Sequence, residues 1–375
     1  GNKKSVFVAS TANDYLTINS AKDDLKAITI ADYTLISNKN KVVAHTLAKS
    51  DVLDNEALVY VKLGDYLSEY KIELRKPDGT LIAEAAFTTN DNADVANKEF
   101  ISTSYIALQL RNLLAVQVIA DGWVIDVLAS SIYIKPPSNF VGDYAVSVTD
   151  AFGGSHLKSF HTTVETLKDL PKVGKNNFQL EVVGSEADSD DNYFVKYNGS
   201  HWEEIAGPDS FYEFDTSTLP IALIKAPSGQ SHDFILTALD GQTFLTYEVP
   251  KWDPREAGNE DTNPFPSFTG QAINDIFFYK NRLGFLSGEN VILSESGNFF
   301  NFFANTVQTA VDSAPIDVAV SYTKAVDLQH AIPFDEGLVL FSDLAQFKLT
   351  SEGTLKNSTV SVDVTTQFEA DLGTK

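Results

Sequence analysis

The feature that most constrains the fold of this chain is a repeated hairpin pattern near its end. Residues 285–297 match residues 341–353 at an offset of 56, because a phenylalanine, an apolar pair, a hydroxyl residue and a closing glycine coincide. An earlier segment, 35–44, has a similar pattern of apolar runs around an asparagine turn. Hairpins that recur at this scale are typical of β-propellers, in which small sheets pack face to face. The repeat therefore predicts a propeller-like domain with Phe285 and Phe341 in equivalent core layers.

Strand patterns dominate the rest of the chain, with one exception. Runs rich in β-branched and aromatic residues alternate with Asn, Gly and Pro turns, as they do in antiparallel sheets. Between residues 103 and 115, in contrast, Ile106, Leu110, Leu113 and Leu114 recur at helical spacing. We expect this stripe to face a core rather than a partner. The predicted fold class is mainly β: a β-propeller-like domain of repeated hairpins with an inserted α+β module.

Changes in composition divide the chain into four segments. A polar stretch precedes the predicted helix, and a Pro-rich connection crosses residues 251–268. The predicted segments are an N-terminal β segment of the propeller-like domain (1–55), the inserted α+β module with one helix (56–165), a β-rich segment (166–255) and propeller-like blades (256–375). Because its 375 residues include no methionine, we also expect the chain to be part of a longer protein.

The charge and the missing residue types exclude several kinds of protein. The net charge is −23, from 28 basic and 51 acidic residues. Tight binding to nucleic acid is therefore disfavoured, since it depends on lysine and arginine replacing the counterions of phosphates. The absence of cysteine excludes disulfides, thiolate nucleophiles and cysteine-ligated metals. No apolar run reaches the roughly 18 residues of a membrane span, so none is predicted.

The sequence contains no pattern typical of catalysis. Glu203 and Glu204 beside Trp202 form the most suggestive carboxylate pair, but neighbours on a strand point to opposite faces. The acidic run 188–192 resembles a calcium loop, yet Tyr193 stands where such a loop needs glycine. We therefore predict no enzyme activity, no catalytic or metal site and no cofactor.

A second set of sequence features carries a family resemblance. It is most specific between about residues 253 and 322, which we call the signature segment. The matching runs include residues 261–268, 273–286, 289–294, 297–303, 315–321 and 364–369. These runs closely resemble the tail tubular protein B (tail nozzle) family of autographivirus-type short-tailed bacteriophages.

The resemblance implies a structural component of a virion tail, made in the bacterial cytoplasm. Members of that family form a homohexameric tube, so the implied partners are further copies of the chain, a tail adaptor (gatekeeper) protein and a tail fibre. Genomic double-stranded DNA is expected to pass through the tube during ejection without tight binding. The alternative is a carbohydrate-active or receptor-binding tail component, since β-rich phage proteins often contact sugars.

Two groups of residues are the candidates for these roles. Aromatic side chains are enriched both in cores and at the centres of interfaces, and carboxylates on a lumen wall would repel DNA. The structural or interface candidates are Phe277, Phe278, Phe285, Phe299, Phe300, Phe302, Phe303 and Phe341. The candidates for an acidic surface or lumen are Glu186, Asp188, Asp190 and Asp191.

Overall fold

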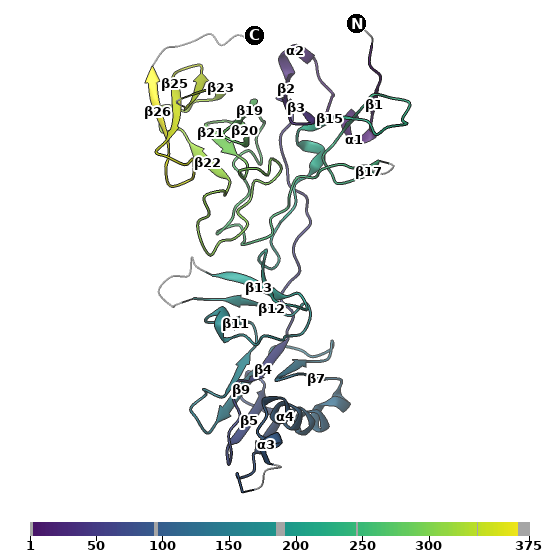
Figure 1. Ribbon diagram of the computed structural model, residues 1–375, viewed down its shortest axis with the longest axis vertical. Helices are drawn as coiled ribbons and strands as arrows, with labels where there is room; N and C mark the ends of the chain where they lie inside the picture. Colours follow the sequence, from purple (N-terminus) through teal and green to yellow (C-terminus); the bar gives the residue numbers. More distant parts are fainter. Residues whose placement is uncertain (1–2, 94–96, 185–191, 245–246, 336, 367–375) are drawn as a thin grey trace. The chain divides into compact units, whose positions relative to one another are not determined.

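The chain forms two compact units, each with its own sheets (Figure 1). The computed structural model describes residues 3–93, 97–184, 192–244, 247–335 and 337–366. Unit 1 comprises residues Gly1–Ser50 and Asp209–Lys375, and unit 2 comprises Asp51–Pro208. The chain is mainly β, as predicted. Among the described residues, no helix is both long and apolar enough to cross a membrane.

Unit 1 begins with a five-stranded sheet in the order β1-β16-β15-β3-β2. Its strands are β1 (Val6–Val8), β2 (Leu25–Ile30), β3 (Tyr33–Asn38), β15 (Ile221–Lys225) and β16 (Phe234–Thr237). β1 pairs with β16 in parallel, and the remaining pairs are antiparallel. Short helices α1 (Ser10–Asn13) and α2 (Ala21–Asp24) precede β2. This sheet therefore joins strands that precede unit 2 in the sequence with strands that follow it.

Two further sheets of unit 1 each contain four antiparallel strands in chain order. The second sheet consists of β19 (Asp275–Tyr279), β20 (Arg282–Ser287), β21 (Asn290–Leu293) and β22 (Ile316–Ala319). The third consists of β23 (Leu328–Phe334), β24 (Gly337–Ser342), β25 (Gln346–Ser351) and β26 (Val360–Thr366). A small hairpin pairs β17 (Thr243–Phe244) with β18 (Tyr247–Glu248).

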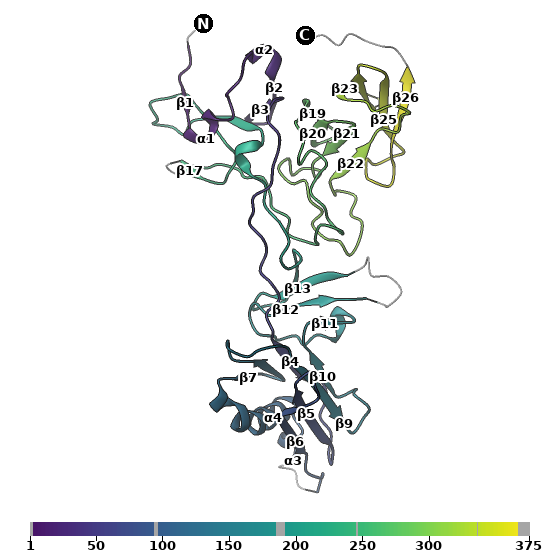
Figure 2. The same ribbon diagram turned by 180° about the vertical axis from the view of Figure 1, so that it is seen from behind.

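Strands β19, β20 and β21 of the second sheet are largely buried on both faces, and this burial holds unit 1 together. Leu283, Phe285 and Ile292 face a core shared with the first sheet. Leu286 and Val291, next to them in sequence, face a core shared with the third sheet, because successive side chains of a strand point to opposite faces. The second sheet lies between the other two in both views (Figure 1, Figure 2).

The repeated segments are hairpins in different sheets, but their structural offset differs from the predicted one. Phe285 pairs with Ile292 across β20–β21, and Leu340 pairs with Phe347 across β24–β25. The equivalent positions are thus 55 residues apart (285 to 340, and 292 to 347). The predicted equivalence of Phe285 with Phe341 is wrong. Leu340 occupies the buried position, whereas Phe341 is half-buried outside that core.

A buried serine lies at the end of a strand, or one residue before it, in each of the three sheets. Ser37, Ser287 and Ser342 are all fully buried. The Ser287 hydroxyl donates to the Ala272 carbonyl at 2.9 Å, and the Ser342 hydroxyl donates to the carbonyl of Ala345 at 2.8 Å. These two bonds satisfy hydroxyls that would otherwise be costly to bury, whereas the Ser37 hydroxyl has no hydrogen-bond partner among the described residues.

The early segment 35–44 follows this pattern only in part. Its first half forms β3, which pairs with β2 in a hairpin that precedes the predicted turn. Val42 and Val43 instead bridge to Ala272 and Thr269. The predicted second strand of that hairpin was wrong, because these residues bridge to the segment that directly follows the Pro-rich connection.

Unit 2 contains three sheets. The first has the order β10-β4-β8-β7, the second β6-β5-β9 and the third β11-β12-β13-β14; β6 and β10 are easiest to find in Figure 2. The strands are β4 (Ala57–Val61), β5 (Glu69–Arg75), β6 (Leu81–Thr88), β7 (Val124–Leu128), β8 (Ser131–Lys135), β9 (Ala145–Asp150), β10 (Leu157–Phe160), β11 (Thr163–Val164), β12 (Gln179–Val182), β13 (Tyr193–Tyr197) and β14 (Trp202–Ile205). The α+β module predicted at 56–165 lies within this unit, which continues through β14.

The predicted helix is α4 (Thr103–Val118), preceded by α3 (Asn97–Phe100). Ser102 caps its N-terminus, since its hydroxyl accepts the N–H of Tyr105 at 3.3 Å. Ile106, Leu110 and Leu114 are fully buried in the unit 2 core, as predicted. Leu113 is not, because it is 40% exposed. The buried stripe continues instead through other side chains of the last turns, Ala115 and Val118.

The register of the repeat predicts different costs for two phenylalanine substitutions. Phe285→Ala should lower the free energy of unfolding by roughly 3–5 kcal/mol, as for other fully buried phenylalanines. Phe341→Ala should cost only about 1–2 kcal/mol, because less apolar surface is lost from burial. Urea unfolding monitored by tryptophan fluorescence measures both. Equal costs would contradict the assignment of Leu340, rather than Phe341, as the equivalent of Phe285.

Candidate functional site

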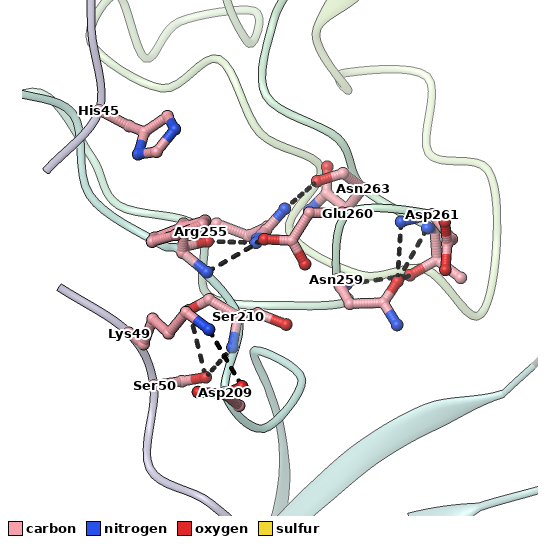
Figure 3. Close-up of polar contacts among 12 residues, drawn as sticks. His45, Lys49, Ser50, Asp209, Ser210, Arg255, Asn259, Glu260, Asp261 and Asn263 are labelled. Carbon is pink, nitrogen blue, oxygen red and sulfur yellow. Dashed lines mark hydrogen bonds and ion pairs between the residues drawn. The ribbon is translucent and has the colours of Figure 1, made fainter. Parts of the chain in front are cut away.

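The signature segment is fixed by two buried arginines, and the first of them, Arg255, is the centre of Figure 3. Pro254 precedes Arg255, and the Arg255 N–H donates to the Tyr212 carbonyl at 2.8 Å. Its side chain, 1% exposed, donates to the carbonyls of Phe211 and Asn263 and to the Glu260 carboxylate, the last at 2.8 Å. We call this group of contacts the Arg255 anchor.

The Arg255 anchor also sets the ionisation of its carboxylate. Burial is the largest single influence on Glu260 and raises its pKa, but the hydrogen bond and the charge of Arg255, together with further hydrogen bonds, outweigh burial, so the pKa of Glu260 lies below its usual value. The same carboxylate accepts the N–H of Phe211 at 3.0 Å. Charge-assisted hydrogen bonds of this kind are stronger than neutral ones. They fix residue 211 to the loop that contains residue 260.

Beside the anchor, three rings form an aromatic cluster. Phe211 and Phe265 each contact the His45 ring, with ring centroids 4.6 and 5.1 Å away. A cation lies over each phenylalanine: Lys49 is 5.0 Å from the Phe211 centroid and Arg255 is 5.2 Å from that of Phe265. Cation–π contacts favour such positions. The aromatic cluster connects residues 45–49 to the signature segment.

Residues 43–50 and 209–215 run antiparallel next to the aromatic cluster. The Thr46 N–H donates to the Glu213 carbonyl and the Ser50 N–H donates to the Ser210 carbonyl, both at 2.9 Å. Lys49 and Asp209 form an ion pair at 3.0 Å, which is visible in Figure 3. Within unit 1, these two segments are therefore paired up to the residues where the chain leaves that unit and re-enters it.

Asparagines fix the loops of the signature segment. The Asn263 amide donates to the carbonyls of Ala257 and Ala304 at 2.8 and 2.9 Å, and its oxygen accepts the Ala304 N–H at 3.1 Å. The Asn301 amide donates to Glu295 at 3.0 Å, while its oxygen accepts the Phe303 N–H at 2.9 Å. The asparagines of this segment thus satisfy backbone groups of loops that lack regular sheet pairing.

The second buried arginine, Arg282, binds only backbone carbonyls. Its guanidinium donates to the carbonyls of Ser294, Ser313 and Ala314 at 2.7, 3.0 and 2.8 Å, and to those of Asp312 and Leu355. Burial lowers the pKa of this guanidinium, although Glu295 opposes the shift. Arg282 therefore holds the long β21–β22 connection against β20 and the β25–β26 connection.

All the predicted phenylalanines belong to unit 1, and most of them lie in its hydrophobic cores. Phe285, Phe302 and Phe303 belong to the core shared by the first two sheets, and Phe285 stacks on Phe302 with centroids 5.0 Å apart. Phe277 lies in the core between the second and third sheets. The partly buried members packed against the first of these cores are Phe278, Phe299 and Phe300. Their part in an interface between copies stays a prediction.

The acidic candidates Glu186, Asp188, Asp190 and Asp191 lie outside the described residues. Among the described residues, no group of three or more His, Cys, Asp or Glu side chains could hold a metal ion. Trp202, beside the carboxylate pair, donates to the Pro171 carbonyl at 2.8 Å and packs edge-on against Phe178 and Tyr197. It therefore serves as packing in unit 2 rather than as an open aromatic platform.

Neither Arg255 nor Arg282 was among the site residues predicted from the sequence. The available signal was their position, since Arg282 begins a strand in which every residue is buried. An arginine in such a run must find partners inside the protein, because an unpaired buried charge is costly. The identity of those partners was not accessible, since they are carbonyls of distant loops.

These features define a mainly β protein whose signature residues stabilise its own fold. Comparison with known sequences identifies the family: the profile described as "Bacteriophage nozzle protein" matches residues 1–375, and the chain belongs to this family. It is 32% identical over 376 aligned positions to tail tubular protein gp12 of Escherichia phage T7. That match covers 98% of this chain but 44% of the relative, so the chain spans less than half of the relative's length. The chain is thus a tail protein of a phage virion.

The carbonyl cluster around Arg282 predicts a large effect from a substitution that conserves charge. Arg282→Lys should lower the free energy of unfolding by roughly 3 kcal/mol or more, because a single ammonium cannot reach the separate carbonyls and leaves several unsatisfied. Arg75→Lys is the matched control, since Arg75 is partly exposed and pairs with Glu73; it should cost less than about 1 kcal/mol. Denaturant titration of both variants measures the difference, and similar losses would contradict this role for Arg282.

Proposed function

We propose that this chain forms part of the wall of a tail nozzle, the conduit through which double-stranded DNA leaves the virion. The observation that carries the proposal is the family match along all 375 residues. The contacts of the signature residues support it, because their arginines and asparagines bond to groups of the chain itself and form a scaffold rather than a reactive centre. In this role the chain is a structural protein and does not act as an enzyme.

The nozzle in this proposal is a homohexameric ring that contacts the tail adaptor and helps to seat the tail fibre. A closed ring requires a heterologous contact, in which two different faces of neighbouring copies meet. Within each copy, we infer that the three stacked sheets of unit 1 are blades of a propeller. This inference is supported by the contacts of β19, the first strand of the second sheet, with both β2 and β23.

The charges of the chain suit a conduit that does not hold DNA. All four arginines are engaged within the chain: Arg75 by Glu73, Arg111 by the Ile125 carbonyl at 2.9 Å, and the two buried arginines by the partners described above. Bidentate arginine contacts to phosphate would need these bonds to break. Six copies at −23 each place on the order of a hundred excess negative charges around the tube.

The ring is tested by reconstruction of the intact tail. We expect six-fold symmetry at the density that fits this chain, with the same pair of surfaces repeated around the axis. The measurement is an electron cryo-microscopy map calculated without imposed symmetry. Three-fold or twelve-fold symmetry at this protein would refute the homohexamer.

The conduit is tested separately by a DNA titration. We expect no useful affinity for free double-stranded DNA, even at about 50 mM salt, where attraction to phosphates is strong. Fluorescence anisotropy of a labelled duplex measures this, with a basic DNA-binding protein as the positive control. Micromolar or tighter binding that weakens steeply with salt would reveal a basic track and exclude the proposed mechanism of free passage.

A further inference from the structure

The outward face of helix α4 exposes apolar side chains in unit 2. Leu108 and Leu113 are each 40% exposed, Val116 is 77% exposed and Ile119, just after the helix, is 54% exposed. The opposite face of the helix packs into the unit 2 core. We call the residues Leu108, Leu113, Val116 and Ile119 the α4 outer face.

The α4 outer face lies in a segment almost without charge. Between residues 103 and 120 the only charged residue is Arg111, and its guanidinium donates to the Ile125 carbonyl and to Asn112. The nearby Gln117 amide donates to the carbonyls of Glu84 and Leu113. In the whole chain, 21% of residues are charged. A solvated helix face normally carries charged residues, so the composition of this face calls for another explanation.

The chemistry of the face selects among possible occupants. It offers no free cation for nucleic acid phosphates. Residues 103–120 also contain no lysine and only the internally bonded Arg111, whereas surface helices that bind anionic lipids are rich in lysine and arginine. A strongly basic partner would be drawn to the acidic surfaces of the chain instead. The remaining occupant is an apolar protein surface of low charge.

A second copy of this chain can be that occupant if the two copies meet through surfaces that carry no charged residues. Each copy carries a net charge of −23, so two copies repel wherever their acidic surfaces come within about 8 Å, the screening length at physiological salt. Contact through a face without charged residues avoids this local repulsion and buries apolar surface. We propose that the α4 outer face is a contact surface between copies of this chain. This inference rests on the proposed homo-oligomeric nozzle.

The absence of cysteine from the chain allows a clean test by site-directed photocrosslinking. Val116→Cys places one thiol on the α4 outer face, and Val141→Cys is the matched control, because Val141 is 93% exposed in a loop of the same unit. Each purified variant is labelled with benzophenone maleimide and irradiated over a range of concentrations. We expect covalent dimers and larger species from the label at 116, and at least five-fold fewer from the label at 141.

A second substitution tests whether the face itself causes the association. Val116→Glu in a chain labelled at a Leu108→Cys thiol should abolish the crosslinked species, while the far-ultraviolet circular dichroism stays unchanged because the side chain is exposed. Equal crosslinking from positions 116 and 141, no crosslinking from either, or crosslinking that survives Val116→Glu would overturn the inference.

The two proposals can fail independently. A six-fold ring in the tail map with the α4 outer face exposed to solvent would remove this inference and leave the nozzle intact. Crosslinked copies through position 116, combined with a tail map of a different symmetry, would retain the contact surface and reject the homohexamer.

Discussion

Unit 1 depends on the burial of both faces of its second sheet. Every residue of β20 is buried, and the side chains of this hairpin alternate between two cores, one shared with the first sheet and one with the third. A sheet that is apolar on both faces cannot be solvated on either. It therefore requires the other sheets, and this requirement brings strands from near position 30 together with strands from near positions 280 and 340. Unit 2 can interrupt unit 1 because the strands that pack against β2 and β3 all lie after unit 2 in the sequence.

The buried arginines donate hydrogen bonds to backbone carbonyls that lie outside the sheets. Long connections between strands contain carbonyls that no neighbouring strand reaches, and a buried carbonyl without a donor is costly. Arg282 donates to five carbonyls of such connections, of which, among the described residues, only that of Ser313 also accepts a backbone N–H, that of Ser296. Arg255 joins the Pro-rich connection to the segment at residue 211. A guanidinium suits this task because it stays charged and presents five N–H groups in a fixed plane. The two arginines thus convert irregular loops into a fixed part of the scaffold.

The sequence predicted the type of most elements and missed the partners that place them. Helix α4 was accessible because Ile106 and Leu110 repeat with helical spacing, and the hairpins were accessible from their alternation. The offset of the repeat was off by one residue, since matching phenylalanines aligned Phe285 with Phe341, whereas pairing aligns it with Leu340. A shift of one residue moves a side chain to the other face of a sheet. Of the candidate site, the phenylalanine cluster was predicted, but the carbonyl partners of the arginines lie 8 to 73 residues away and no local pattern encodes them.

The same distribution of charge explains why this chain can be both strongly acidic and part of an assembly. The chain has 51 acidic and only 28 basic residues, and its two buried arginines make their contacts inside the fold. The resulting excess of carboxylates on the surface disfavours contact between copies through acidic surfaces. Association must then use surfaces from which charge has been removed, and a helix face with apolar side chains and a single, internally bonded arginine has that property. The distribution of charged residues therefore determines which surfaces of two copies can come into contact. Apolar burial supplies the attraction, and like-charge repulsion elsewhere on the surface disfavours every other relative orientation of two copies.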